Sequence, residues 1–363
     1  MKFRTELKPG KGKLTLDPEH PVTMLGSCFS DNIGRKMRSL LWDARVNSCG
    51  VVFNPVVIEK LLQLASLFPA ENHDHNNYGN ESEEYDIEKI MRALDNRESA
   101  DREAAEKLRE YALDCGEYCL NYLFSSKFAG ETVEDALLKC VWALRRLKRD
   151  IEDSDALILT LGSAYVYRLK ERRNIAVGNC HKRPAADFDV QLLHPKDVTD
   201  LLDSIFNIAR KMNPRIKMVV TVSPVRHLGN NPQGSFSGNI ISKANLIAGT
   251  LEFLKHHSEE ETAYFPAYEI MIDDLRDYRW YADDLLHPSD KAVEYIWEKF
   301  RDCHLDGKGI ALLAEAENIV RSLCHRPIVG FTRESLDFAL AAEDAAMNFN
   351  MRHAGMLSAR GEN

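Results

Sequence analysis

Two apolar stretches constrain the fold of this chain more than any other feature. Residues 156–161 read Ala-Leu-Ile-Leu-Thr-Leu and end at Gly162, and residues 216–222 repeat the pattern before Ser223-Pro224. Short apolar runs that end at turn residues are typical of strands buried on both faces, as in a parallel sheet covered by helices. The chain therefore predicts an α/β fold.

The other elements follow an alternating order. Weaker strand patterns occur at residues 22–25, 44–47 and 263–265, and the first of them ends in a turn at Gly26. Helical patterns separate the strands, at 31–41, 56–68, 197–212, 242–255 and 288–300. This alternation implies a mainly parallel sheet with right-handed crossovers, in a three-layer α/β/α sandwich.

Residues 1–300 are predicted to form one sheet-centred domain. Residues 86–153 carry long helical patterns, at 102–122 and 132–148, and are predicted to be a helical insertion that packs on this domain. Residues 301–363 form accessory C-terminal helices, at 307–323 and 334–348, with an end that frays from Arg352.

Composition excludes several classes of function. The net charge of −9 opposes binding to nucleic acid, because phosphates require a basic face. No stretch approaches the roughly 20 apolar residues of a membrane helix, and residues 1–13 are basic without the apolar segment of a signal peptide. We therefore expect a cytoplasmic protein without a membrane partner, whose ligands are small molecules or carbohydrates.

The eight cysteines do not indicate a disulfide scaffold or a zinc site, because they are spread widely and lack paired CxxC spacing. Cys115 and Cys119 are one helical turn apart, which fits a buried helical face better than a shared metal. His73 and His75 lie in a polar stretch, residues 71–84, that we interpret as a solvated excursion. No metal and no cofactor are predicted.

Polar residues follow each predicted strand. In a doubly wound sheet the carboxyl ends of the strands meet at one crevice, where ligands bind. Five clusters are expected at that edge: Gly26-Ser27-Cys28, Asn47 to Asn54, Gly162-Ser163, Ser223 to His227, and Asp284 to His287.

This chain resembles the GSCFA family, which is placed with the SGNH or GDSL-type esterases. The resemblance covers most of residues 1–300 and is carried by six motifs in order: Leu25–Gly34, Phe53–Pro55, Thr160–Tyr165, Asn179–Lys182, Thr221–Pro224 and Asp284–His287. It implies a flavodoxin-like sheet of SGNH-hydrolase type and acyl-ester chemistry.

Asp284 and His287 match the late Asp-x-x-His motif of SGNH enzymes. This spacing lets one loop present a carboxylate to one imidazole nitrogen while the other nitrogen faces a nucleophile. The structural alternative is a helix entry, with His287 just before Pro288 and Asp284 as a capping residue. We favour the catalytic interpretation because the pair also lies on the functional edge.

Two residues compete for the role of nucleophile. Aligned without a gap on the Gly-Asp-Ser-Leu motif of the superfamily, Gly26-Ser27-Cys28-Phe29 puts Cys28 at the position of the serine. A thiol is chemically reasonable there, because a helix N-terminus and an imidazolium both stabilise thiolate. Shifting the turn by one residue would keep serine chemistry on Ser27 and leave Cys28 as a buried hydrophobe. We favour Cys28.

The oxyanion hole is predicted to combine the N–H of the nucleophile with N–H groups of later loops. Gly50 is the candidate second donor, and the block at Gly162 lacks the Asn that SGNH enzymes carry there. Asn179 is a possible replacement, His181 with Lys182 is a candidate site for an anionic group, and Arg226 with His227 is a candidate substrate contact.

Two classes of function remain. The first is an acyl-ester hydrolase or O-acyltransferase, acting on O-acetylated carbohydrate by analogy with the family. Coenzyme A is a conceivable acyl donor, although no phosphate-binding glycine motif requires it. The second is a carbohydrate- or nucleotide-binding module without turnover, which the missing Asn supports.

Overall fold

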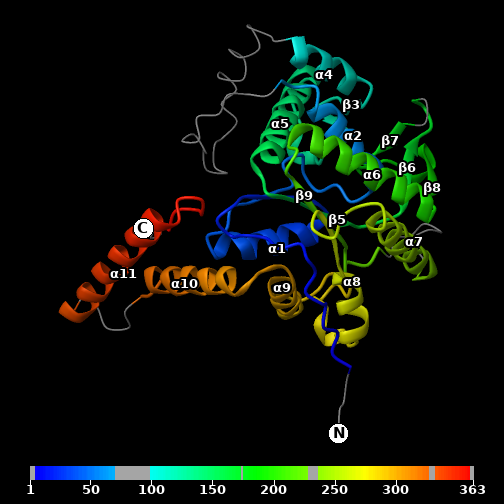
Figure 1. The fold of residues 1–363 in the computed structure, drawn as a ribbon. Coiled ribbons are helices and arrows are strands. Elements are labelled where there is room, and N and C mark those ends of the chain that lie inside the picture. The colour runs from blue at the N-terminus through cyan, green and yellow to red at the C-terminus, as the bar shows by residue number, and fades with distance from the viewer. Residues whose placement is uncertain (1–4, 70–98, 173–174, 228–235, 327–331, 360–363) are drawn as a thin grey trace.

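The computed structural model describes residues 5–69, 99–172, 175–227, 236–326 and 332–359. Its centre is a parallel sheet in the order β10-β9-β5-β1-β2 (Figure 1). Counted along the chain, this is the order 2-1-3-4-5 of flavodoxin-like sheets, so the predicted fold class is confirmed. The strands are β1 (Val22–Gly26), β2 (Ala44–Val46), β5 (Ala156–Leu161), β9 (Lys217–Val222) and β10 (Thr262–Phe265).

Alternate residues of the central strands enter two hydrophobic clusters, one on each face of the sheet. In β5, Leu157, Leu159 and Leu161 belong to one cluster, whereas Ala156 and Ile158 belong to the other. Every residue of β5 is buried. This is the reason for the uninterrupted apolar run, because a strand covered on both sides has no face for polar side chains.

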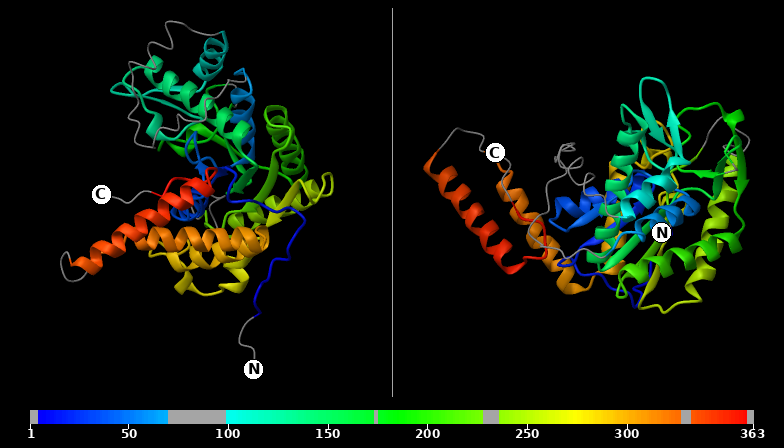
Figure 2. Two further views of the ribbon diagram at one scale, coloured as in Figure 1. Left: turned by 60° about the vertical axis from the view of Figure 1, so that its left-hand side comes forward. Right: turned by 90° about the horizontal axis from the view of Figure 1, so that it is seen from above.

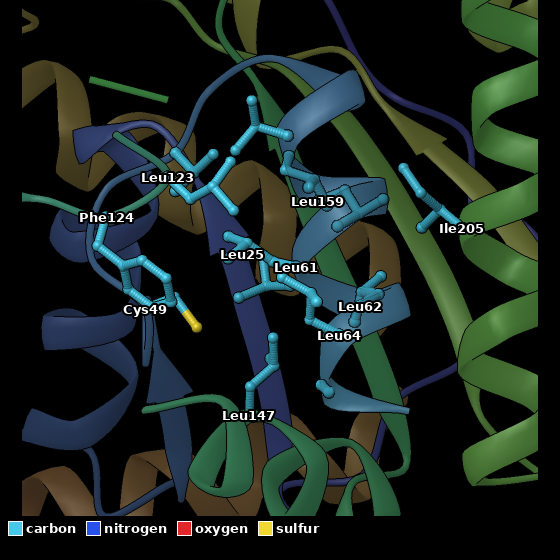
Figure 3. Packing of buried hydrophobic residues seen from close by; sticks show 14 of the residues in the cluster. Leu25, Cys49, Leu61, Leu62, Leu64, Leu123, Phe124, Leu147, Leu159 and Ile205 are labelled. Carbon is cyan, nitrogen blue, oxygen red and sulfur yellow. The ribbon is translucent and has the colours of Figure 1, made fainter. Parts of the chain in front are cut away.

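Helices form a layer on each side of the sheet (Figure 1). Side chains of α2, α5, α6 and α7 enter the first cluster, and those of α1 and α9 enter the second. Figure 3 shows Leu61 of α2, Leu147 of α5 and Ile205 of α6 around Leu25 and Leu159 of the strands. These helices are α1 (Cys28–Ser39), α2 (Pro55–Ala65), α5 (Val133–Asp153), α6 (Pro195–Met212), α7 (Phe236–Leu254) and α9 (Asp290–His304).

The first helix begins earlier than its apolar pattern predicts. We expected a start near Asp31, whereas α1 begins at Cys28 with Ser27 as its N-cap. The Ser27 side chain accepts a hydrogen bond from the Phe29 N–H, and such a cap satisfies one of the free N–H groups of a first turn. The nucleophile candidates therefore lie at the helix N-terminus itself.

A hairpin replaces part of the expected helix at residues 102–122. Helix α4 (Ser99–Arg109) is followed by the antiparallel strands β3 (Ala112–Asp114) and β4 (Cys119–Asn121). Asp114 accepts a hydrogen bond from the Gly116 N–H, and Gly116 has the positive φ of 88° that a tight turn favours. Cys115 is exposed and Cys119 is buried, so the prediction of a shared helical face was wrong.

A second small sheet, which the sequence analysis missed, follows β5. Its strands pair in the antiparallel order β7-β6-β8. The polar stretch with His73 and His75 lies outside the described residues. The remaining elements between α4 and α9 are η1 (Ser126–Phe128), β6 (Tyr165–Leu169), β7 (Ile175–Val177), η2 (Ala185–Asp187), β8 (Phe188–Leu192), α8 (Ala267–Glu269), η4 (Ile270–Asp274) and η5 (Tyr278–Trp280).

The C-terminal helices α10 (Gly307–Leu323) and α11 (Arg333–Arg352) pair with each other and extend away from the sheet (Figure 2). We expected the chain to fray from Arg352. Residues 353–359 instead return to the body, where Met356 is buried and the Leu357 N–H donates to the Leu41 carbonyl at 2.7 Å. In the described part of the chain, no helix combines the length and apolarity of a membrane span.

Candidate active site

The turn after β1 requires a glycine at position 26. Strand pairing places Gly26 opposite Thr160, and Gly26 has a φ of 145°. A Cβ atom there would lie 2.2 Å from the Thr160 carbonyl oxygen. The following Ser27 N–H donates to that oxygen at 3.1 Å. Close packing of two strand ends thus positions the start of α1.

Ser27 and Cys28 differ in their surroundings. Ser27 is only 2% exposed, and its hydroxyl donates to the Ser223 hydroxyl at 2.9 Å while accepting the Phe29 N–H at 3.3 Å. Cys28 is half-buried and is the first residue of α1. Its N–H has no carbonyl of the helix to bind, which leaves that donor available for an oxyanion.

The pKa of the Cys28 thiol reflects opposing effects. Burial is the largest effect and raises this pKa, and the carboxylate of Asp31 one helical turn later raises it further. The backbone N–H groups of Cys28 and Phe29 and the positive charge of Lys243 lower it. The net effect is a raised pKa, so the resting form is a thiol that a base must deprotonate before it attacks.

Asp284 and His287 form a hydrogen-bonded pair within one loop. The Asp284 Oδ2 atom lies 2.6 Å from His287 Nδ1, and Oδ1 accepts the N–H groups of Leu286 and His287, both at 2.9 Å. These hydrogen bonds, led by the backbone N–H of His287, lower the pKa of Asp284 to about 2. Leu285 takes a positive φ of 59° to close the loop. Asp284 therefore stays ionised and fixes the orientation of the imidazole ring.

This loop is docked on the segment that follows β9. The Arg226 N–H donates to the Leu286 carbonyl at 3.1 Å, and the Arg226 guanidinium lies 4.4 Å from the ring centre of Tyr281. Because Ser223 at the end of β9 also contacts Ser27, one strand end links the Asp284–His287 loop to the start of α1. Among the residues described, no hydrogen bond joins His287 directly to Ser27 or Cys28.

His227 lies beside the same strand ends as a half-buried, neutral side chain. Its ring packs 5.2 Å from the Phe53 ring, and its Nε2 atom has no hydrogen-bond partner within the described residues. Burial, followed by the charges of Lys243 and His287, lowers the pKa of His227 to about 3. His227 is therefore uncharged at neutral pH.

The backbone N–H groups of the two glycines predicted at the oxyanion hole already have acceptors within the protein. The Gly162 N–H donates to the Phe53 carbonyl at 2.7 Å. Ser163 Oγ, in the block that lacks the Asn, accepts the Tyr165 N–H. The Gly50 N–H donates to the Asn47 carbonyl at 2.6 Å, so that donor has an acceptor inside the protein.

Asn179 and His181 contact strand β4 and the residue after it. The Asn179 N–H donates to the Tyr122 carbonyl, and His181 Nε2 lies 2.9 Å from the Asn121 carbonyl. Burial lowers the pKa of His181. Within the described ranges, no hydrogen bond or ring contact joins these two side chains to Cys28 or to the Asp284–His287 loop.

Lys243 of α7 is a site residue that the sequence analysis missed. It is fully buried, and its ammonium donates to the carbonyls of Gly162 and Ser223, at 2.7 and 2.8 Å. The only available signal was its isolation, because Lys243 is the one charged side chain between Arg226 and Glu252. In the described ranges, no three His, Cys, Asp or Glu side chains gather as metal ligands.

One protein family matches most of this chain. The model of the GSCFA family matches residues 21–300, a range that contains every strand-end residue described above. A similar solved structure is a carbohydrate esterase family 3 protein from Talaromyces cellulolyticus, with 11% sequence identity and a TM-score of 0.28. That match covers 47% of this chain and 65% of the esterase, just under two thirds of its length. No curated protein matches this chain.

Proposed function

This chain belongs to the GSCFA family, and from that premise we propose that it is an acyl-ester hydrolase or O-acyltransferase that works through a covalent acyl-enzyme. The observation that carries the proposal is the Asp284–His287 pair, held by Arg226 on the strand end whose Ser223 contacts the start of α1. Acyl transfer needs a carboxylate that orients an imidazole next to a nucleophile, and the proposal assigns these three roles to Asp284, His287 and Cys28.

In the proposed mechanism, His287 Nε2 takes the proton of the Cys28 thiol while Sγ attacks the ester carbonyl carbon. The N–H groups at the start of α1 bind the oxyanion of the tetrahedral intermediate. The bond to the ester oxygen then breaks, and His287 returns the proton to the leaving alcohol. Water, or a second alcohol in a transferase, attacks the thioester and releases Cys28 as a thiol.

Cys28 is favoured over Ser27 by their hydrogen bonds. The Ser27 hydroxyl is buried and already both donates and accepts within the protein, whereas the Cys28 thiol is half-buried and interacts with the backbone N–H groups at the start of its own helix. As substrate class we propose O-acetylated carbohydrate. The exposed ring of Tyr278 beside Arg226 would offer a flat surface for a sugar.

A screen of chromogenic acetyl and longer-chain esters tests the activity. We expect turnover by the intact protein, and a fall of about 10⁴-fold or more in His287→Ala, as when one member of a triad is removed. Iodoacetamide should block activity by labelling Cys28. Loss of activity in Cys28→Ala with retention in Ser27→Ala supports the proposed nucleophile, and the reverse pattern would assign it to Ser27.

A non-catalytic carbohydrate- or nucleotide-binding module is the second candidate. The block at Gly162 lacks the Asn that donates to the oxyanion in SGNH enzymes, and this absence favours the second candidate. Ser163, the residue after Gly162, accepts the Tyr165 N–H with its hydroxyl oxygen. Equal carbohydrate binding by the intact protein and His287→Ala, with no ester turnover by either, would select this candidate.

A further inference from the structure

A buried ammonium group, that of Lys243, lies at the ends of β5 and β9. The Lys243 side chain is 0% exposed, and its Nζ atom contacts two carbonyl oxygens, those of Gly162 after β5 and Ser223 after β9. Among the described residues no carboxylate pairs with it. Burial of a lysine without a counter-charge is costly and calls for a reason other than stability.

The position of Lys243 is tied to the start of α1. Ser223, whose carbonyl accepts one of its hydrogen bonds, also receives the hydroxyl hydrogen bond of Ser27. The charge of Lys243 acts on both Cys28 and His227. His227 is neutral and has an unpaired Nε2 atom, so it supplies no competing charge. The ammonium is therefore fixed by two strand-end carbonyls, at a position from which its charge acts on the thiol that we propose as nucleophile.

The electrostatics of the two groups are coupled. Burial lowers the pKa of Lys243 to about 7, and the negative charge of a Cys28 thiolate opposes this effect. Among the described residues, the other titratable groups near Lys243 and Cys28 are Asp31, which raises the pKa of Cys28, and Tyr268, whose ring centre lies 5.7 Å from Lys243 Nζ. The Asp284–His287 pair and Arg226 lie on the adjoining loop and the segment after β9. Lys243 is the side chain whose positive charge offsets Asp31 at Cys28.

We propose that Lys243 is a positioning residue for Cys28, whose ammonium group, held at the ends of β5 and β9, keeps the thiol reactive near neutral pH. This inference rests on the proposed role of Cys28. The thiol proton goes to His287 in the proposed mechanism and to solvent during alkylation, and in both cases the Lys243 ammonium stabilises the thiolate that remains. At higher pH the ammonium loses its own proton to solvent, and that stabilisation is lost.

Coupled groups titrate in two macroscopic steps. In the form that has lost one proton, the proton has left either Lys243 or Cys28, so a fixed fraction of Cys28 is thiolate. The rate of Cys28 alkylation should therefore rise with pH to a plateau near neutrality and rise again at alkaline pH. A cysteine without such a partner gives one step.

Iodoacetamide labelling, followed by mass spectrometry of the Cys28 peptide as a function of pH, tests the proposal. In Lys243→Met we expect a single step at higher pH and a labelling rate at pH 7 that is lower by about tenfold, the effect of one pKa unit. In Lys243→Arg we expect a single step at lower pH than in Lys243→Met, because the charge is kept and does not titrate.

Lys148→Met is the matched control, because Lys148 is also buried, on α5, and pairs with Glu152. It should keep the two-step profile of the intact protein. If Lys243→Met does not fold, the two steps of the intact protein and the single step of Lys243→Arg still decide the question. One identical step in the intact protein and both Lys243 variants would overturn the proposal.

The labelling rate is independent of ester turnover, so the two proposals can fail separately. Two steps without any esterase activity would keep the role of Lys243 and reject the hydrolase. Esterase activity that requires Cys28, with a labelling profile that is insensitive to Lys243, would reject the role of Lys243 alone.

Discussion

At the scale of single residues, the site depends on short contacts between strand ends. The Asp284 carboxylate accepts three hydrogen bonds from its own loop, including that of the His287 ring. These bonds are local in sequence, which is why an Asp-x-x-His pattern could predict them. The contacts of Ser27 with Ser223, and of Lys243 with Gly162, join residues far apart in the chain and had no such pattern.

Replacing Asp284 with Asn should lower kcat/KM by about 10⁴-fold while leaving the fold intact, because the amide would favour the wrong tautomer of His287. The pKa of Asp284 is about 2, so its own titration should not appear in the pH–rate profile above pH 4. Ester hydrolysis rates and a circular dichroism spectrum measure the two effects. A variant with unchanged kcat/KM would remove Asp284 from the mechanism.

Gly26→Ala should destabilise the fold by about 3 kcal/mol or more, because its Cβ would collide with the Thr160 carbonyl and its φ is positive. Urea denaturation measures this free energy of unfolding. Gly116→Ala is the control, since Gly116 also has a positive φ but no atom within 4 Å of the added Cβ. It should lose only about 1 kcal/mol. Equal losses would mean that backbone conformation, and not the contact with β5, requires glycine at position 26.

At the scale of elements, the periodic segments were predictable and the irregular ones were not. Strand β5 and helix α10 have the predicted bounds, because uninterrupted apolar runs and helical periodicity are local signals. The β3–β4 hairpin was wrongly predicted as part of a helix, because its apolar residues also fit helical spacing. Strands are favoured by the pairing of Leu113 with Leu120, which places both side chains in the first hydrophobic cluster.

Helix α11 should be anchored by its C-terminal half. Phe349 is fully buried and belongs to the second cluster, whereas Phe338 is 47% exposed. We expect Phe349→Ala to lower the free energy of unfolding by about 4 kcal/mol, as for other buried Phe side chains, and Phe338→Ala to change it by less than about 0.5 kcal/mol. Thermal or urea unfolding compares them, and equal effects would contradict the anchoring.

At the scale of the whole molecule, buried histidines should make the fold sensitive to acid. Burial lowers the pKa of His304 to about 4, and a backbone contact with Leu14 opposes this effect only in part. The folded state therefore holds the neutral form, while the unfolded chain gains a proton as the pH falls below about 6.5. His304 opposes folding increasingly between pH 6.5 and 4, by about 3 kcal/mol at the lower end.

Stability measured by urea should fall as the pH is lowered through this window, and His304→Leu should reduce the slope. The exposed His325 is the control, because its replacement by Gln should leave the slope unchanged. His227, with a pKa of about 3, adds a parallel effect that remains in both variants. A slope that is the same in His304→Leu and the intact protein would show that His304 is accommodated in its charged form.

By itself the sequence determined the fold class, the succession of strands and helices along the chain, and the Asp284–His287 pair. Each of these depends on residues close together in the chain: apolar runs for buried strands, helical periodicity, and a three-residue spacing within one loop. Only the tertiary structure decided that Ser27 is buried against Ser223, that Asn179 and His181 contact the β4 segment, and that Lys243 donates to the Gly162 and Ser223 carbonyls. These positions depend on which distant strand ends pack together, because a buried polar side chain lies where backbone carbonyls or other polar groups can form hydrogen bonds with it.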